Sequence, residues 1–139
     1  MPVSNIPNPM EITLKNLQKK TPIPRDKILK ATKAAFRKLK VIQSGLSIVF
    51  VGTKRMRAIN KKYLNHDYAA DVLTFDFGGA CGEIIICPRI AASNAKAHQT
   101  STENEIIYYV IHGILHLAGF DDHKPRDIPQ MRRMEKELL

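Results

Sequence analysis

Residues 102–123, TENEIIYYVIHGILHLAGFDDH, combine the strongest helical pattern of the chain with three of its five histidines. Thr102 and Glu105 have the spacing of a capping box, in which the Thr102 hydroxyl accepts from the Glu105 amide and Glu105 reaches back. The apolar residues that follow predict a helix over residues 103–119. Gly119 is expected to end this helix, because glycine readily adopts the left-handed conformation found after many helices.

His112 and His116 are four residues apart, so on a helix their rings project from one face, one turn apart. Two such imidazoles can take adjacent positions around one Zn²⁺ at about 2.0–2.1 Å. After Gly119 the chain can double back and bring a third ligand from another direction, and we predict His123 as that ligand. Three protein ligands leave a fourth position for water, which is the arrangement of a catalytic zinc ion.

The residue after His112 is Gly113, where a zinc protease has the glutamate that acts as its general base. We therefore expect Gly113 to leave space near the metal for a large substrate, and we favour a peptidase less. Asp121 and Asp122 are the nearest candidates for a catalytic base or for a group that polarises the metal site. Aspartates are also common in turns that follow helices, so the sequence leaves a catalytic role and a turn role equally open for both residues.

Outside this stretch the chain alternates apolar segments with amphipathic ones. The patterns predict strands at residues 46–51, 71–77 and 83–87, and helices at residues 26–42, 54–63, 90–98 and 128–139. Residues 1–25 are expected to be irregular, since the first ten residues carry three of the eight prolines and show no periodicity. This order of elements predicts a single domain over residues 1–139, in which helices cover a small sheet.

The chain carries 22 Lys and Arg residues against 13 Asp and Glu residues, a net charge of +9. Such an excess favours polyanionic partners, and we place nucleic acid ahead of an anionic membrane surface. No apolar run approaches the roughly 20 residues of a spanning helix, and the N-terminus lacks a secretory signal, so we expect a cytoplasmic protein. One basic stripe on the helix at residues 26–42 is either a solvated face or a nucleic-acid-binding surface: Lys30, Lys33, Arg37 and Lys40.

The two cysteines, Cys81 and Cys87, flank the stretch GEIII and, if that stretch is a strand, would lie about 20 Å apart, too far for a disulfide. We predict that both are buried thiols, which suits a reducing compartment. His66 and His98 have no assigned role and are expected to be surface residues.

Three blocks of the sequence resemble the YbeY family of endoribonucleases. The stretch HGILHLAGFDDH, from His112 to His123, is similar to the signature of that family. Residues 59–75, INKKYLNHDYAADVLTF, are similar to a block in which an Asn and a Tyr precede Thr-Asp-Val-Leu-Ser-Phe. Residues 82–86, GEIII, are similar to its Gly-Asp/Glu-Ile strand, and the resemblance covers residues 45–139.

The resemblance implies an α+β fold with a mixed sheet of about four strands, and one Zn²⁺ per chain held by three histidines. It also implies single-strand-specific cleavage of RNA and maturation of the 3′ end of small-subunit ribosomal RNA. A role in ribosome biogenesis and association with the small ribosomal subunit follow from the same resemblance.

The chain departs from the family pattern in two places. Members have two residues between the glycine and the third histidine, whereas this chain has Phe120, Asp121 and Asp122, so either aspartate is an alternative third ligand. Members also carry an arginine after the tyrosine of the second block, where this chain has Leu64. The resemblance implies that this arginine contacts the scissile phosphate, and Arg57 or a nearby lysine is the candidate substitute.

The sequence therefore favours a zinc-dependent endoribonuclease, with two alternatives. One is a zinc hydrolase of peptides or small molecules, against which Gly113 and the net charge of +9 both count. The other is a non-catalytic ribosome-assembly factor with structural zinc, which Leu64 and the altered spacing before His123 support.

Overall fold

The structure, a computed structural model, describes residues 11–40, 45–79 and 81–139. All the predicted helices and strands are present in this part of the chain, with slightly different ends. The predicted end of the first helix, residue 42, falls outside the described residues. The elements are β1 (Ile12–Asn16), α1 (Arg25–Leu39), β2 (Leu46–Phe50), α2 (Thr53–Leu64), β3 (Val72–Gly78), β4 (Cys81–Ile86), α3 (Pro88–Ala97), α4 (Thr102–Leu117) and α5 (Ile128–Leu138).

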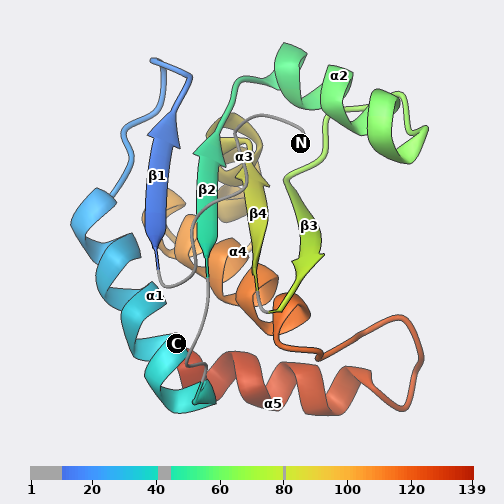
Figure 1. The fold of residues 1–139 in the computed structure, drawn as a ribbon. Helices are drawn as coiled ribbons and strands as arrows, with labels where there is room; N and C mark the ends of the chain where they lie inside the picture. Colours follow the sequence, from blue (N-terminus) through green and yellow to red (C-terminus); the bar gives the residue numbers. More distant parts are fainter. Residues whose placement is uncertain (1–10, 41–44, 80) are drawn as a thin grey trace.

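The strands form one four-stranded mixed sheet in the order β1-β2-β4-β3 (Figure 1). β1, β2 and β4 run parallel, and β3 runs antiparallel to β4, with Val72 opposite Ile86. Figure 1 shows β1 and β3 at the two edges of the sheet. This arrangement confirms the α+β fold and the mixed four-stranded sheet.

The expectation of an irregular segment over residues 1–25 is wrong for β1, and residues 1–10 lie outside the described residues. β1 pairs in parallel with β2, from Ile12 opposite Leu46 to Asn16 opposite Phe50. The five residues of β1 are too few to show a clear period, and their hydrogen-bond partners lie far along the chain. A local pattern does not report such a non-local pairing.

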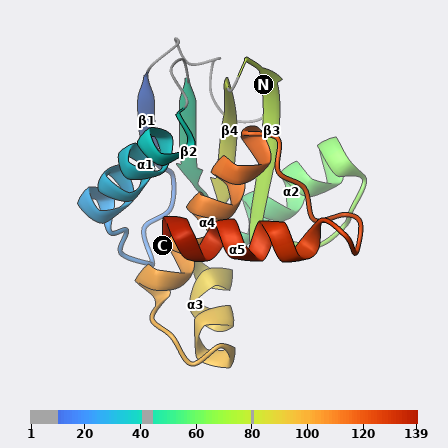
Figure 2. The ribbon, with the colours of Figure 1, turned by 90° about the horizontal axis from the view of Figure 1, so that it is seen from below.

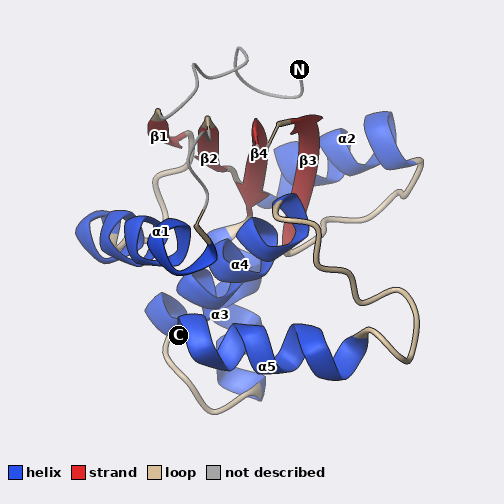
Figure 3. Cartoon of the chain, turned by 60° about the horizontal axis from the view of Figure 1, so that its bottom comes forward, coloured by secondary structure: helices blue, strands red, loops and turns tan. Residues whose placement is uncertain are grey.

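Residues that alternate along β2 and β4 divide between two apolar clusters, because successive side chains of a strand point to opposite faces. Ile48 and Ile84 pack in a large cluster with α1, α4 and α5, which lie together on one side of the sheet (Figures 2 and 3). Val49 and Ile85 pack in a smaller cluster that includes Met56 of α2. Among the described residues, no helix is both long and apolar enough to cross a membrane.

α4 approaches the sheet closely at Gly113. A Cβ atom at this position would lie 2.6 Å from Ile84 Cδ1 and 3.1 Å from Thr74 Oγ1. Gly113 is buried, so its missing side chain lets the helix pack on β3 and β4. The expectation that Gly113 leaves space beside the metal for substrate is therefore wrong.

α4 also begins differently from the prediction. Ser101 is the N-cap residue, and its hydroxyl accepts from the Asn104 backbone N–H at 3.1 Å. Thr102 is already helical, and the buried Glu105 directs its carboxylate to His98 Nδ1 at 3.2 Å. The predicted capping box between Thr102 and Glu105 is therefore wrong, since Glu105 contacts the end of α3 instead.

Both cysteines are free thiols, as predicted, but only one of them is fully buried. Cys87 lies in the smaller apolar cluster, whereas Cys81 is half-buried. Burial raises the pKa of the Cys87 thiol.

Candidate metal centre

His112 and His116 lie on one face of α4, in its last two turns, as predicted. Their Nε2 atoms are 3.0 Å apart, and the planes of the two rings are nearly perpendicular, at 80°. Both side chains are largely buried, with 19% and 25% of their surfaces exposed. The structure thus brings two imidazole nitrogens together at one point of the molecular surface.

Glu135, on α5, fixes the ring of His112 from behind. Its Oε2 lies 2.5 Å from His112 Nδ1, and a carboxylate can only accept, so Nδ1 donates. The Nε2 atom of His112 therefore presents a lone pair to His116. Arg132 donates to the other Glu135 oxygen at 3.2 Å. A carboxylate behind a histidine in this way orients and polarises the ring in many metal sites.

The surroundings of His116 favour the protonation state that a metal ligand needs. Desolvation on burial lowers the pKa of His116, and the nearby His112 ring lowers it further. Both effects favour the neutral imidazole, which is the form that binds a metal ion.

The chain turns back immediately after α4, as the sequence predicts. Gly119 adopts a φ of 99°, its N–H bonds the His116 carbonyl at 3.1 Å, and the Phe120 N–H bonds the Leu115 carbonyl at 3.0 Å. These two bonds form a Schellman motif, for which glycine is favoured at the left-handed position. Phe120 packs against the core and anchors the loop that follows.

Asp121 then directs Asp122 toward the histidines. Asp121 Oδ1 accepts from the backbone N–H groups of His123, at 3.0 Å, and Asp122, at 2.7 Å, and these bonds lower the pKa of Asp121. The Asp122 carboxylate lies 3.6 Å from His112 Nε2 and 3.7 Å from His116 Nε2. His112, His116 and Asp122 thus form a group that could hold a metal ion.

The distances within this group are near those of a bound metal ion. In a tetrahedral zinc site with bonds of about 2.0–2.1 Å, the ligand atoms lie about 3.3–3.4 Å from one another. The two Nε2 atoms here are 3.0 Å apart, and Asp122 places Oδ2 at 3.6 Å from His112 and Oδ1 at 3.7 Å from His116, so a small shift of these side chains would complete such a site. Two imidazole nitrogens and a carboxylate that converge in this way are a donor set for a divalent cation.

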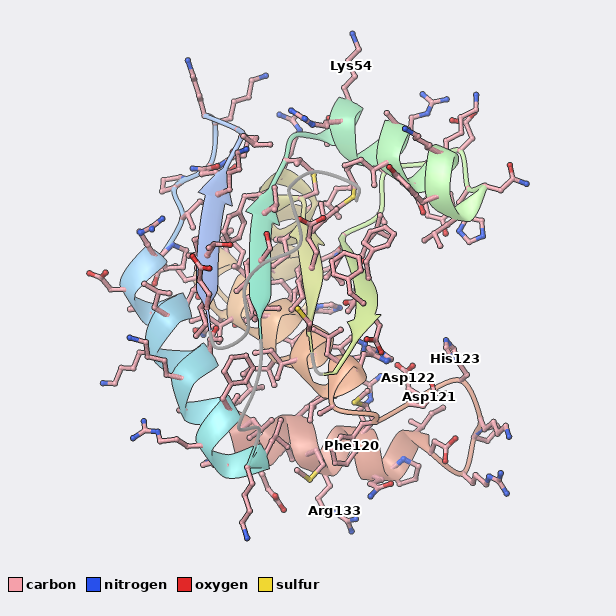
Figure 4. All side chains as sticks on the ribbon, in the orientation of Figure 1. Lys54, Phe120, Asp121, Asp122, His123 and Arg133 are labelled. Atoms are coloured by element: carbon pink, nitrogen blue, oxygen red, sulfur yellow. The ribbon has the colours of Figure 1, made fainter. Side chains whose placement is uncertain are left out.

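The structure does not bring His123 into this group. Its side chain is 82% exposed, with Nδ1 at 2.8 Å from Asp121 Oδ1. Its ring centre lies 6.4 Å from that of His116. Figure 4 shows His123 on the outer side of the loop, with Asp122 closer to α4.

The group lies in a cleft of about 550 Å³ between β3, α4, α5 and the loop after α4. Arg132 lines this cleft together with apolar and aromatic side chains and the three candidate metal ligands. The lining residues are Asp71, Val72, Leu73, Thr74, Tyr108, Tyr109, His112, His116, Asp122, His123 and Arg132.

Other predicted site residues lie elsewhere. Arg57 forms an exposed ion pair with Asp67, its Nε 2.8 Å from Asp67 Oδ1, and does not line the cleft. The basic stripe is exposed on α1, near the β1 edge of the sheet, whereas the cleft lies against β3 (Figure 1). The stripe consists of Lys30, Lys33, Arg37 and Lys40.

Two residues of α5 at the site were missed in the sequence. Arg132 lines the cleft, and Glu135 holds His112. The sequence contains one signal for Glu135, because it follows the buried Met131 by four residues and so falls on the apolar face of the helix. A charged residue on such a face indicates a specific buried partner.

The sequence model of the family described as Endoribonuclease YbeY matches residues 13–139. The chain belongs to the YbeY endoribonuclease family. Endoribonuclease YbeY of Chlorobium luteolum is 37% identical over 97 residues, which are 68% of this chain and 71% of that protein. Endoribonuclease YbeY of Chloroherpeton thalassium is 33% identical over 123 residues, 86% of this chain and 87% of that protein. A solution structure from Thermotoga maritima is 28% identical, with a TM-score of 0.65, and covers 91% of this chain and 85% of that one.

In this YbeY-family chain, Leu64 lines a second cavity beside the metal cleft. Its side chain is partly exposed, and the cavity, of about 470 Å³, shares Asp71, Val72 and Leu73 with the cleft. The position that resembles the family's arginine thus lies close to the candidate metal centre but presents an apolar side chain.

Proposed function

We propose that this chain is a zinc-dependent, single-strand-specific endoribonuclease that takes part in ribosomal RNA maturation. The observation that carries this proposal is the convergence of His112, His116 and Asp122 in one cleft with Arg132. Membership of the YbeY family, whose relatives bear the name endoribonuclease, supports the same reaction.

His112, His116 and Asp122 would hold the ion, and Glu135 would orient His112. We propose Asp122 as the third ligand because its carboxylate already faces both histidines, whereas His123 is 82% exposed and its Nδ1 contacts Asp121. The extra residue between Gly119 and His123 is consistent with this choice. When bound, Zn²⁺ supplies Lewis acidity that activates water and offsets negative charge on a phosphate oxygen.

Arg132 is our candidate for the phosphate contact, in place of Arg57. One of its terminal nitrogens donates to the Tyr108 hydroxyl at 2.7 Å and to Glu135 at 3.2 Å. These bonds hold the guanidinium at the cleft, and its remaining N–H groups can bind phosphate oxygens. Arg132 on α5 would therefore supply the positive charge that the family's arginine supplies at the position of Leu64.

Two exposed rings support a single-stranded substrate. His66 and Tyr68 stack with their planes at 12° and their centres 5.5 Å apart. Both line the second cavity, and Tyr68 is 57% exposed. Bases can stack on such rings only when they are not paired in a duplex, so this aromatic pair favours single strands.

We further propose that the substrate is small-subunit ribosomal RNA near its 3′ end, with the small ribosomal subunit as partner and the cytoplasm as location. The net charge of +9 supports a polyanionic partner of this kind.

The test compares cleavage of a labelled single-stranded RNA, and of the same sequence in a duplex, by the purified protein and its His116→Ala variant. We expect the unaltered protein to cut the single strand in preference to the duplex and the variant to lose both zinc and cleavage. Equal cleavage by the two preparations would assign the activity to a contaminant. Hydrolysis of a peptide library without RNA cleavage would favour the other zinc hydrolases.

One observation favours a non-catalytic assembly factor as the second candidate, namely the apolar Leu64 beside the cleft. Under this alternative, a His116→Ala protein would still bind the small subunit and would restore ribosomal RNA maturation in cells that lack the unaltered protein. Under the proposed function the variant would bind without restoring maturation.

A further inference from the structure

A large basic cavity lies at the carboxyl ends of the three parallel strands. Its volume is about 840 Å³, and its walls come from the segment after β1, the start of α2 and the start of α3. Ligands of open α/β sheets commonly bind beyond the carboxyl ends of strands. No acidic residue of the described chain lines this cavity, whereas five cations do: Lys19, Lys20, Lys54, Arg55 and Arg89.

The five cations gather around one cavity without a carboxylate partner in the part of the chain that the structure describes. Within residues 11–40, 45–79 and 81–139, none of the five forms an ion pair, although Arg57 pairs with Asp67 and Arg132 with Glu135. All five side chains are exposed. Five like charges around one cavity repel one another, and an anionic ligand relieves that repulsion.

The start of α2 adds to the positive potential. Gly52 is its N-cap residue, with no side-chain cap and no acidic residue in the first turn. The unpaired backbone N–H groups of such a turn carry the positive end of the helix dipole. Lys54 and Arg55 lie in this same turn.

We propose that this basic cavity binds the phosphodiester backbone of RNA, as an anchoring site separate from the metal cleft. The inference rests on the proposed function for the identity of the polyanion. A concave surface with cations on several walls suits a chain of phosphates better than the flat surface of a bilayer. Figure 4 shows Lys54 at one end of the molecule and Asp122 and His123 well away from it, so one bound RNA must span both regions.

Two consequences follow from this separation. Long RNA contacts the cavity and the cleft together, so loss of the cavity cations should raise KM for long substrates and leave kcat nearly unchanged. A short oligonucleotide that fills only the cleft should be cut equally well by the altered and unaltered proteins.

The test measures binding of long and short single-stranded RNA by metal-free protein, in which no cleavage interferes. The variant is Lys54→Gln with Arg55→Gln, and the matched control is Arg133→Gln with Lys136→Gln on α5, which removes one Lys and one Arg from another exposed surface. We expect the cavity variant to bind long RNA about 25-fold more weakly at about 0.1 M salt, since two lost contacts at a slope of about 0.7 each lower log K by about 1.4. The control should bind as the unaltered protein does.

Several outcomes would overturn the inference. Equal weakening in both variants would show a general effect of net charge, and weakening only in a Lys30→Gln and Lys33→Gln variant would assign the RNA to α1. Weaker binding to anionic lipid vesicles with unchanged RNA binding would assign the cavity to a membrane. Because binding is measured without metal, a protein that binds RNA at the cavity but never cuts it would refute only the proposed function.

Discussion

Glu135 Oε2 contacts His112 Nδ1 at 2.5 Å and so joins the last helix of the chain to the candidate metal centre. The contact lies behind the ring, on the side away from the nitrogen that faces His116 and Asp122. It explains why a charged residue stands on the buried face of α5.

Replacing Glu135 with Gln should weaken metal binding while leaving all three proposed ligands in place. The amide keeps the size of the side chain but loses the charge that orients and polarises His112. We expect about a 10–100-fold loss of zinc affinity, the usual effect of removing such a partner. Competition with a chromophoric chelator measures the change. Glu137→Gln, an exposed substitution on the same helix, is the control, and equal affinities in the two variants would refute the role of Glu135.

Asp122→Ala and His123→Ala should separate the two candidates for the third ligand. If Asp122 binds the metal, its loss should reduce zinc affinity by more than the about 10–100-fold expected for an indirect contact. His123→Ala should then retain zinc, because its ring is 82% exposed and bonded to Asp121. Zinc content after dialysis, measured by mass spectrometry, decides the matter. Loss of zinc in His123→Ala alone would restore the three-histidine site that the family resemblance implies.

Most of the fold was predictable because its elements carry local patterns. Helix α4, the turn at Gly119 and the central strands follow from apolar periodicity and from the preference of glycine for a positive φ. β1 was missed because its stability comes from pairing with β2, which no pattern within five residues reveals.

The candidate site was predictable only in part, for a related reason. The spacing of His112 and His116 fixes their common face, since both lie on one helix. The positions of Asp122, His123, Arg132 and Glu135 depend on how a loop and a second helix return to α4. Spacing along the chain sets no such direction, so the prediction of His123 as the third ligand left Asp121 and Asp122 open as alternatives.

Tyr68→Ala should weaken binding of single-stranded RNA, whereas Tyr68→Phe should preserve it. The exposed ring stacked on His66 offers a face to one unpaired base, and such a stack contributes about 1–3 kcal/mol. Phenylalanine keeps the ring and loses only the hydroxyl, which lies 3.3 Å from His66 Nδ1. Fluorescence anisotropy with metal-free protein measures the affinities. Equal weakening by both substitutions would point to the hydroxyl rather than to stacking.

Gly113→Ala should destabilise the protein although alanine favours helices. The new methyl group would lie 2.6 Å from Ile84 Cδ1, in a buried contact between α4 and β4. Overpacking of this kind costs about 1–3 kcal/mol, and the gain in helix propensity returns about 1 kcal/mol, so we expect a net loss of about 1 kcal/mol. Urea denaturation of the metal-free protein measures the change. Ile84→Ala removes both the Cδ1 and the Cγ1 atoms, which would lie 2.6 and 2.9 Å from the new methyl group. Gly113→Ala should therefore cost less in that background, and an unchanged cost in the double-mutant cycle would show that this contact does not set the distance between helix and sheet.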